Sequence, residues 1–302
     1  MNAAAPPTSK IVYVKLLLMA VFWGGTFIAG KIVAQRVGPY SAAFLRFAIA
    51  SVFLCLTAIK MEGHLPALRL RHLFPIFLLG MTGVFAYNVF FFKGLKLIEA
   101  SRAAIIIANN PICIALFSAL LFREQLTPTR LTGILISIGG AVLVITRGDL
   151  HMIASGAVGW GELFILGCVA SWVTFSLLGK LLLAELSPLA SVLYAALCGA
   201  VCLAVPAWQE GILTAWPSYT VVDWGALFYL GFFGTVLGFV WYYQGIQRIG
   251  AMKAGVFINF VPISAIIFSF FILHEPLSFS LLIGAAMVLS GVYLTNRETP
   301  PR

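Results

Sequence analysis

Charged residues are scarce in this sequence. Asp, Glu, Lys and Arg together make up 10% of its 302 residues, against 61% hydrophobic residues. Water-soluble globular domains carry roughly 25% charged residues, so this composition excludes a soluble protein. The apolar residues form roughly ten runs of about 20, and each run is long enough for a helix to cross the ~30 Å hydrocarbon core of a bilayer. The sequence therefore predicts an all-α integral membrane protein.

Acidic residues are missing from the middle of every apolar run. All ten Asp and Glu residues and all four His residues lie near the ends of runs or in the connections. A cation-selective multidrug pump or a proton antiporter would each be expected to bury an acid at mid-membrane depth, so this absence disfavours both. A deep pair of basic residues for a phosphate group is missing too. Arg46, the deepest basic residue, is interpreted as snorkelling or packed against a neighbouring helix.

Cysteine is also rare, and all five cysteines fall inside apolar runs. Since no His or acid stands near them to complete a zinc shell, disulfides and metal sites are both disfavoured. The net charge of +9 comes from basic residues scattered singly at run ends, which favours membrane orientation over nucleic-acid binding. An intramembrane enzyme would need a nucleophile beside a base, or a metal cluster. The sequence offers neither, so we expect no enzyme, no cofactor and no nucleic-acid partner.

A long internal repeat is present. Residues 79–140 recur as residues 230–291, at an offset of 231 − 80 = 151 positions between matching glycines. A shorter match lies upstream at an offset of 172 − 23 = 149 positions. It pairs Trp23 with Trp172, Lys31 with Lys180, and Pro39 with Pro188. The chain is therefore predicted to consist of two related halves, residues 1–147 and 148–302.

Each half contains about five apolar runs. Helices are expected at about 11–31, 40–60, 73–93, 101–122, 129–146, 160–180, 188–207, 222–244, 252–273 and 278–295. Because five is odd, the second half enters the membrane from the opposite side. This predicts two inverted five-helix repeats around a central cavity, the architecture of many secondary transporters that alternate between two states.

The connections decide the orientation. With the N-terminus inside, twelve Lys and Arg residues lie in inner segments and six in outer ones. Lys and Arg mark the cytoplasmic side of a membrane protein. We therefore expect a multi-pass protein of the inner membrane with both termini in the cytoplasm. The sequence does not determine the oligomeric state, and a monomer suffices for this architecture.

Aromatic and amide side chains occupy the middle of the runs. The candidate substrate-binding residues are Trp23, Thr26, Tyr87, Asn88, Asn109, Asn110, Trp172, Phe175, Trp241, Tyr242 and Asn259. Helix packing explains any single aromatic residue equally well, whereas the matched Trp pair favours the cavity. For the asparagines at 109, 110 and 259, interhelical hydrogen bonding and substrate contact are equally favoured.

Two further matched pairs are candidates for moving parts. Pro111 and Pro262 fall inside runs, where each ring removes a backbone donor and either kinks the helix or frees a carbonyl for a substrate ammonium. Lys31 and Lys180 end equivalent helices on opposite faces; orientation is the simpler explanation, and a gate on each side is the alternative. Glu275, which matches Glu124, is expected to accept hydrogen bonds from the amides of the next helix.

Several segments resemble a known family. They are the stretch WGGTFIAGK at 23–31, Pro39 followed by Arg46, and Asn110-Pro111 leading to Glu124-Gln125-Leu126-Thr127 and Gly139-Gly140. In this order they resemble the EamA-type branch of the drug/metabolite transporter superfamily over nearly the whole chain. The resemblance implies ten helices, inverted repeats, and a cavity walled by helices one, three, four, six, eight and nine.

The resemblance also implies export of amino acids or related metabolites across the inner membrane. Missing acids depart from the cationic-drug pattern and missing deep basic residues from the phosphate pattern, so a neutral or zwitterionic substrate is expected. Aromatic lining is similar to that of YddG-like amino-acid exporters. The expected site lies near Trp23, Asn110, Trp172 and Trp241, with a small molecule and membrane lipid as the only partners. A broad-specificity drug or metabolite exporter is the alternative, and a channel is a further rival.

Overall fold

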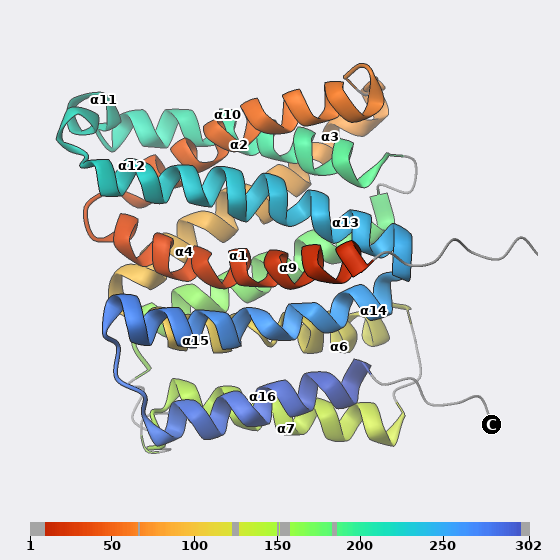
Figure 1. Cartoon of the computed structure of the whole chain (residues 1–302), viewed down its shortest axis with the longest axis vertical. Helices are drawn as coiled ribbons and strands as arrows, with labels where there is room; N and C mark the ends of the chain where they lie inside the picture. The colour runs from red at the N-terminus through yellow and green to blue at the C-terminus, as the bar shows by residue number, and fades with distance from the viewer. Residues whose placement is uncertain are drawn as a thin grey trace, which may run out of the picture.

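The computed structural model of the chain describes residues 10–65, 67–122, 127–149, 151, 158–182 and 186–296. All of its regular elements are helical, and the long helices are stacked side by side, most of them roughly horizontal in the view of Figure 1. Nine helical spans within the described residues are long and apolar enough to cross a membrane. A tenth apolar helix, Phe279–Thr295, is shorter. The predicted ten-helix membrane protein is thereby confirmed.

Six spans are continuous helices. They are α1 (Lys10–Ala34), α2 (Pro39–Glu62), α7 (Pro128–Ile145), α9 (Trp160–Leu182), α10 (Pro188–Gln209) and α16 (Phe279–Asn296). Three of them begin with a proline, whose fixed φ and missing N–H suit the first helical turn. Thr127 accepts a hydrogen bond from the Arg130 amide and Ser278 from the Leu281 amide, which confirms both as N-caps.

The third and eighth spans each contain a π-helical segment at matching positions of the repeat. The third is built from α3 (Leu70–Leu79), η1 (Gly80–Ala86) and α4 (Tyr87–Leu97). The eighth follows the short α11 (Ile212–Ala215) and η2 (Trp216–Ser218), and is built from α12 (Val221–Phe228), η3 (Tyr229–Leu237) and α13 (Gly238–Ile249). Since a π turn disturbs the regular hydrogen-bond ladder, some of its carbonyls take other donors. Here Asn88 Nδ2 donates to Val84, Thr235 Oγ1 to Leu230, and Trp23 Nε1 to Gly234.

The fourth and ninth spans are broken at the matched prolines. The fourth consists of α5 (Ala100–Ile107) and α6 (Asn110–Phe122), and the ninth of α14 (Ala251–Val256), η4 (Phe257–Asn259) and α15 (Phe260–Leu273). Pro111 and Pro262 thus lie in the first turn of a new helix, where a missing N–H is tolerated. The regular α-helix is thus interrupted just before each proline, by a two-residue turn in the fourth span and by the 3₁₀ segment η4 in the ninth.

Small residues bring the helices close together. A Cβ on Gly133 would lie 2.7 Å from the Gly291 carbonyl oxygen, and one on Gly140 would lie 2.7 Å from the Gly284 carbonyl oxygen. These contacts join α7 to α16, which lie side by side at the bottom of Figure 1. Close backbone approach is the usual way membrane helices pack, because lipid supplies no hydrophobic drive between them.

The two halves run in opposite senses. Lys31, near the end of α1, donates to the carbonyl of Ile98 at the end of α4, at 2.8 Å. Gly161, at the start of α9, packs against Leu97 at that same end of α4. Equivalent helices α1 and α9 therefore begin on opposite faces of the bundle, as inverted repeats require. The predicted division at residue 147 falls between α7 and α9.

Candidate functional site: a central aromatic cavity

One cavity of about 920 Å³ occupies the centre of the described bundle. All six helices expected to wall it contribute side chains, and α2, α7, α10 and α16 contribute as well. Of the candidate binding residues, the cavity brings together Trp23, Thr26, Tyr87, Asn88, Asn110, Trp172, Phe175, Tyr242 and Asn259, together with both prolines. The cavity is therefore lined by aromatic and polar side chains from both halves of the chain.

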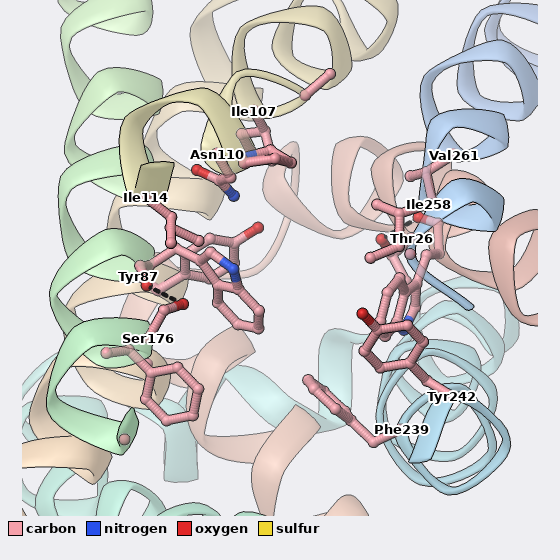
Figure 2. A pocket seen from close by; sticks show the side chains of 18 of the residues that line it. Thr26, Tyr87, Ile107, Asn110, Ile114, Ser176, Phe239, Tyr242, Ile258 and Val261 are labelled. Atoms are coloured by element: carbon pink, nitrogen blue, oxygen red, sulfur yellow. Dashed lines mark hydrogen bonds between the residues drawn. The ribbon is translucent and has the colours of Figure 1, made fainter. Parts of the chain in front are cut away.

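Aromatic rings form two opposed walls. On one wall Trp172 packs against Tyr87 and Phe175, with ring centroids 5.5 and 5.2 Å apart. On the other, Trp23 packs against Phe239 and Tyr242 at 5.4 and 5.5 Å. Figure 2 shows Tyr87 and Asn110 facing Thr26 and Tyr242 across the open space. Such a space suits a ligand with an apolar or aromatic body.

The neighbouring asparagines at the break of the fourth span have different surroundings. Asn109 Oδ1 accepts a hydrogen bond of 2.7 Å from Ser137 Oγ on α7, and its Nδ2 donates to the carbonyls of Ile105 and Ile106. It lies outside the cavity lining. Asn110 lines the cavity, and its Oδ1 is buried with no hydrogen-bond partner among the described residues. An unpaired buried acceptor is costly, so Asn110 is the better candidate for substrate contact.

This difference predicts opposite effects for one substitution at adjacent positions. Asn109→Ala is expected to lower the thermal stability by ~1 kcal/mol through the lost interhelical bond, with substrate affinity unchanged. Asn110→Ala is expected to leave the melting temperature unchanged. It is expected to raise the substrate concentration at half-maximal transport several-fold, which corresponds to about 1 kcal/mol of lost binding free energy. Thermal unfolding in detergent and transport in liposomes measure the two effects. The reverse pattern would remove Asn110 from the site.

Arg46 is a cavity residue that sequence reasoning did not select. It projects from α2, is 8% exposed, and lines the cavity. Its NH1 donates to Asn88 Oδ1 at 2.9 Å, and its Nε and NH2 lie 3.3 and 3.4 Å from Thr235 Oγ1. Packing against neighbouring helices was expected, whereas exposure to the cavity was not. A single Arg two turns inside an apolar run was the available signal.

The cavity lining extends to one face of the described bundle. Its lining reaches Arg130 at the start of α7, Pro188 at the start of α10, and Thr295 at the end of α16. At the other end Phe27 and Phe91 pack edge to face at 5.5 Å and are 4% and 1% exposed. These two rings form the floor of the cavity, and we call the face beyond them the closed face.

Hydrogen bonds and ion pairs tie the closed face together. Glu275, just after α15, accepts hydrogen bonds from the amides of Ala100 and Ser101 at 2.6 and 3.0 Å, and from Ser101 Oγ at 2.7 Å. Arg102 lies 3.1 Å from Glu99 and 3.6 Å from Glu162. A carboxylate at a helix N-terminus is stabilised by the exposed amides and the helix dipole. Glu275 therefore holds the ninth span against the start of the fourth.

Glu99 remains ionised within this network. Burial acts to raise the pKa of its carboxyl group, but its own backbone amide and the nearby Arg102, Arg147 and Lys31 outweigh burial. The net effect is a lowered pKa. Its ion pair with Arg102 is thus kept at neutral pH.

The remaining candidates lie elsewhere. Trp241 is outside the cavity lining, and its ring packs against Phe22 of α1 at 5.6 Å. Lys31 lies on the closed face, with its ammonium on the Ile98 carbonyl. The side chain of Lys180 and the whole of Glu124 lie outside the described residues. Glu275 caps the fourth span rather than the helix that follows it, whose first turn is capped by Ser278 instead.

Known proteins resemble this chain over nearly its full length. The "Uncharacterized transporter YyaM" of Bacillus subtilis is 31% identical over 281 residues, covering 93% of this chain and 92% of the relative. A "Probable terminal-alkyne amino-acid exporter" of Streptantibioticus cattleyicolor is 29% identical over 293 residues, covering 96% and 95%. A crystal structure with a TM-score of 0.64 and 21% identity covers 95% of this chain and 97% of its own, which supports the fold.

The family assignment rests on both halves. The sequence matches the EamA-like transporter family over residues 10–146 and again over residues 159–297. These two matches take in all the helices whose bounds are given above, and with them the cavity and its closed face. The chain belongs to the EamA-like transporter family.

Proposed function

We propose that this transporter exports amino acids or related small neutral or zwitterionic metabolites by alternating access. The observation that carries the proposal is the aromatic cavity itself, whose lining reaches one face and ends toward the other at the floor of Phe27 and Phe91. In this proposal the halves 1–147 and 148–302 rock about the cavity, as inverted-repeat carriers do. A secondary transporter of this kind needs no cofactor and no catalytic group.

The direction follows from the proposed orientation. With both termini in the cytoplasm of an inner-membrane protein, as the basic residues favour, the open face is cytoplasmic. The state described is then the loading state of an exporter. Opening the closed face would release the substrate to the outside.

The substrate class is supported by the lining. The described lining residues include Arg46 and Arg130 but no Asp or Glu, which disfavours a purely cationic substrate. Aromatic rings accept an apolar or aromatic side chain, while Asn110 and Asn259 offer hydrogen bonds to its polar end. The relative from Streptantibioticus, which shares 29% of its sequence, is named as a probable amino-acid exporter.

A broad-specificity metabolite or drug exporter is the second candidate. The observation that favours it is size, because about 920 Å³ lies near the upper end of the ~300–1,000 Å³ range of ligand pockets. An aromatic cavity of that volume has room for several shapes.

Counterflow into liposomes tests both candidates. Purified protein is reconstituted into vesicles preloaded with an unlabelled amino acid, and uptake of the labelled compound is followed with and without a pH gradient. A carrier of amino acids is expected to show saturable accumulation, which an open channel does not. If no amino acid shows counterflow and other metabolites do, the second candidate is the better assignment.

A further inference from the structure

The Arg46 guanidinium is a buried cation without a counter-ion. The described carboxylates near the cavity ends all have other partners: Glu99 and Glu162 face Arg102, Glu275 and Glu210 cap helices, and Asp223 faces Thr220 and Arg36. None of the carboxylates in the described segments lies within ion-pair distance of Arg46. Burying a charge is costly unless an opposite charge joins it. The part of the chain that the structure describes does not supply this anion.

The partners of Arg46 fix the guanidinium without neutralising it. Asn88 Oδ1 and Thr235 Oγ1 are neutral acceptors. Each is itself tied to a π-helical segment, Asn88 through Val84 and Thr235 through Leu230. A guanidinium has five N–H donors, and these contacts use three of them. Two donors remain on a group held rigidly at the cavity wall, which is the fork that a carboxylate accepts.

The Arg46 cluster also breaks the internal symmetry. The offset of the first helices places 46 + 149 = 195 opposite Arg46, and Ala195 lines the same cavity. A part that opens or closes a face is needed once on each side, so it is expected to recur in both halves. A group that holds one end of a ligand is needed only once. The asymmetry therefore assigns Arg46 to binding rather than to gating.

We propose that Arg46, positioned by Asn88 and Thr235, is the subsite for a carboxylate group of the transported molecule. This inference rests on the proposed transport of small zwitterions and deepens it, because it makes the acid group the recognised feature. The unpaired Oδ1 of Asn110 in the same cavity is an acceptor for the ammonium end. Amines and amides that lack a carboxylate are poor ligands for such a cavity.

Binding to purified protein tests the subsite without transport. The first set of probes shares a phenyl ring and varies the polar end: phenylalanine, 3-phenylpropanoate, phenylalanine amide and 2-phenylethylamine. The second set shares a branched aliphatic chain: leucine, 4-methylpentanoate and leucine amide. Thermal unfolding against ligand concentration gives each affinity. The acids are expected to bind roughly ten- to hundredfold more tightly than the amides and the amine.

Variants separate charge from fold. Arg46→Gln is expected to bring acid and amide affinities within about threefold of each other, since the charge-assisted bonds are lost. Arg46→Lys keeps the charge but not the fork, so the acids remain preferred with lower affinity. Arg248→Gln, which changes an exposed arginine of α13, is expected to keep the wild-type preference. If Arg46→Gln does not fold, the wild-type and Lys series still decide the matter.

The outcomes separate this inference from the function on which it rests. If the wild-type protein shows amino-acid counterflow but Arg46→Gln still binds the acids preferentially, the subsite is overturned and the transport proposal stands. Acid preference that depends on Arg46, without counterflow of any amino acid, would overturn the amino-acid assignment and support the subsite. Equal binding of acids, amides and the amine by the wild type, or stabilisation by none of the probes, would overturn the subsite.

Discussion

Replacing Glu275 by alanine is expected to loosen the closed face and to reduce transport about tenfold or more. Its carboxylate accepts three hydrogen bonds at the start of α5, and bonds to a charged group contribute about 1.5–3 kcal/mol. Losing that much stability from one state shifts the balance of two states by roughly ten- to hundredfold. A carrier that cannot hold the closed face shut spends less time in the loading state.

Hydrogen exchange and counterflow measure this effect together. The amides of Ala100 and Ser101 are expected to exchange faster in Glu275→Ala, while those in the middle of α5 keep their protection. Unchanged exchange and normal transport would mean that the cap does not contribute to closure.

Glu210 supplies a matched control for the Glu275 cap. Its carboxylate accepts hydrogen bonds from the Ser41 amide and Ser41 Oγ, both at 2.7 Å, at the start of α2. The α2 and α10 helices it joins pack together, and neither Glu210 nor Ser41 lines the cavity. Glu210→Ala is expected to lower the melting temperature without faster exchange at Ala100. If Glu210→Ala and Glu275→Ala lower the melting temperature equally and also lose transport equally, the effect of Glu275→Ala is general destabilisation and not opening of the closed face.

The helices and their number were predictable because apolar length alone determines them. A run of about 20 apolar residues has one stable way to cross a bilayer, so the spans follow directly from composition. The opposite orientation of the second half followed from the odd number of helices in each repeat, without knowledge of any contact between helices. Caps at Thr127 and Ser278 were predictable because each hydrogen bond joins residues only three positions apart.

The interruptions of the helices were harder to predict. The π segments η1 and η3 depend on side chains that satisfy the freed carbonyls, among them Trp23, which comes from a helix 211 positions earlier in the chain. The Glu275 cap likewise joins residues 175 positions apart. Sequence placed Glu275 at a helix end and gave it the correct kind of partner, but the partner helix follows from tertiary packing alone.

The cavity lining shows the same limit at single residues. Trp23 and Trp172 were selected by their matched positions, and both line the cavity. Trp241 was also selected as an aromatic residue in the middle of a run, but its ring packs against Phe22, and the next residue, Tyr242, lines the cavity instead. Successive residues of an α-helix point to different sides of it, so a shift of one position decides which residue faces the cavity. Arg46 was passed over because a lone cation in lipid usually reaches for the surface, and only the contacts with Asn88 and Thr235 show that this one does not.

Replacing Trp172 by alanine is expected to lower transport about tenfold while leaving folding intact. The ring contacts Tyr87 and Phe175 and reaches Phe239 on the opposite wall at 6.3 Å, so its loss opens the aromatic enclosure on one side. Aromatic pairs contribute about 0.5–1.5 kcal/mol beyond buried area, and the lost ligand contact adds to this. Counterflow over a range of substrate concentrations gives the half-saturation value, which is expected to rise.

Two variants make the Trp172 experiment specific. Trp172→Phe keeps a ring in place and is expected to retain most of the transport. Loss of transport in Trp172→Ala but not in Trp172→Phe would assign the effect to the aromatic ring. Trp160→Ala removes the same side chain from the start of the same helix, where Trp160 is 72% exposed and outside the cavity, and is expected to transport normally. Monodisperse elution from a sizing column confirms the folding of each variant. Normal transport by a well-folded Trp172→Ala protein would remove this residue from the site, and with it the argument that the matched tryptophans mark the substrate cavity.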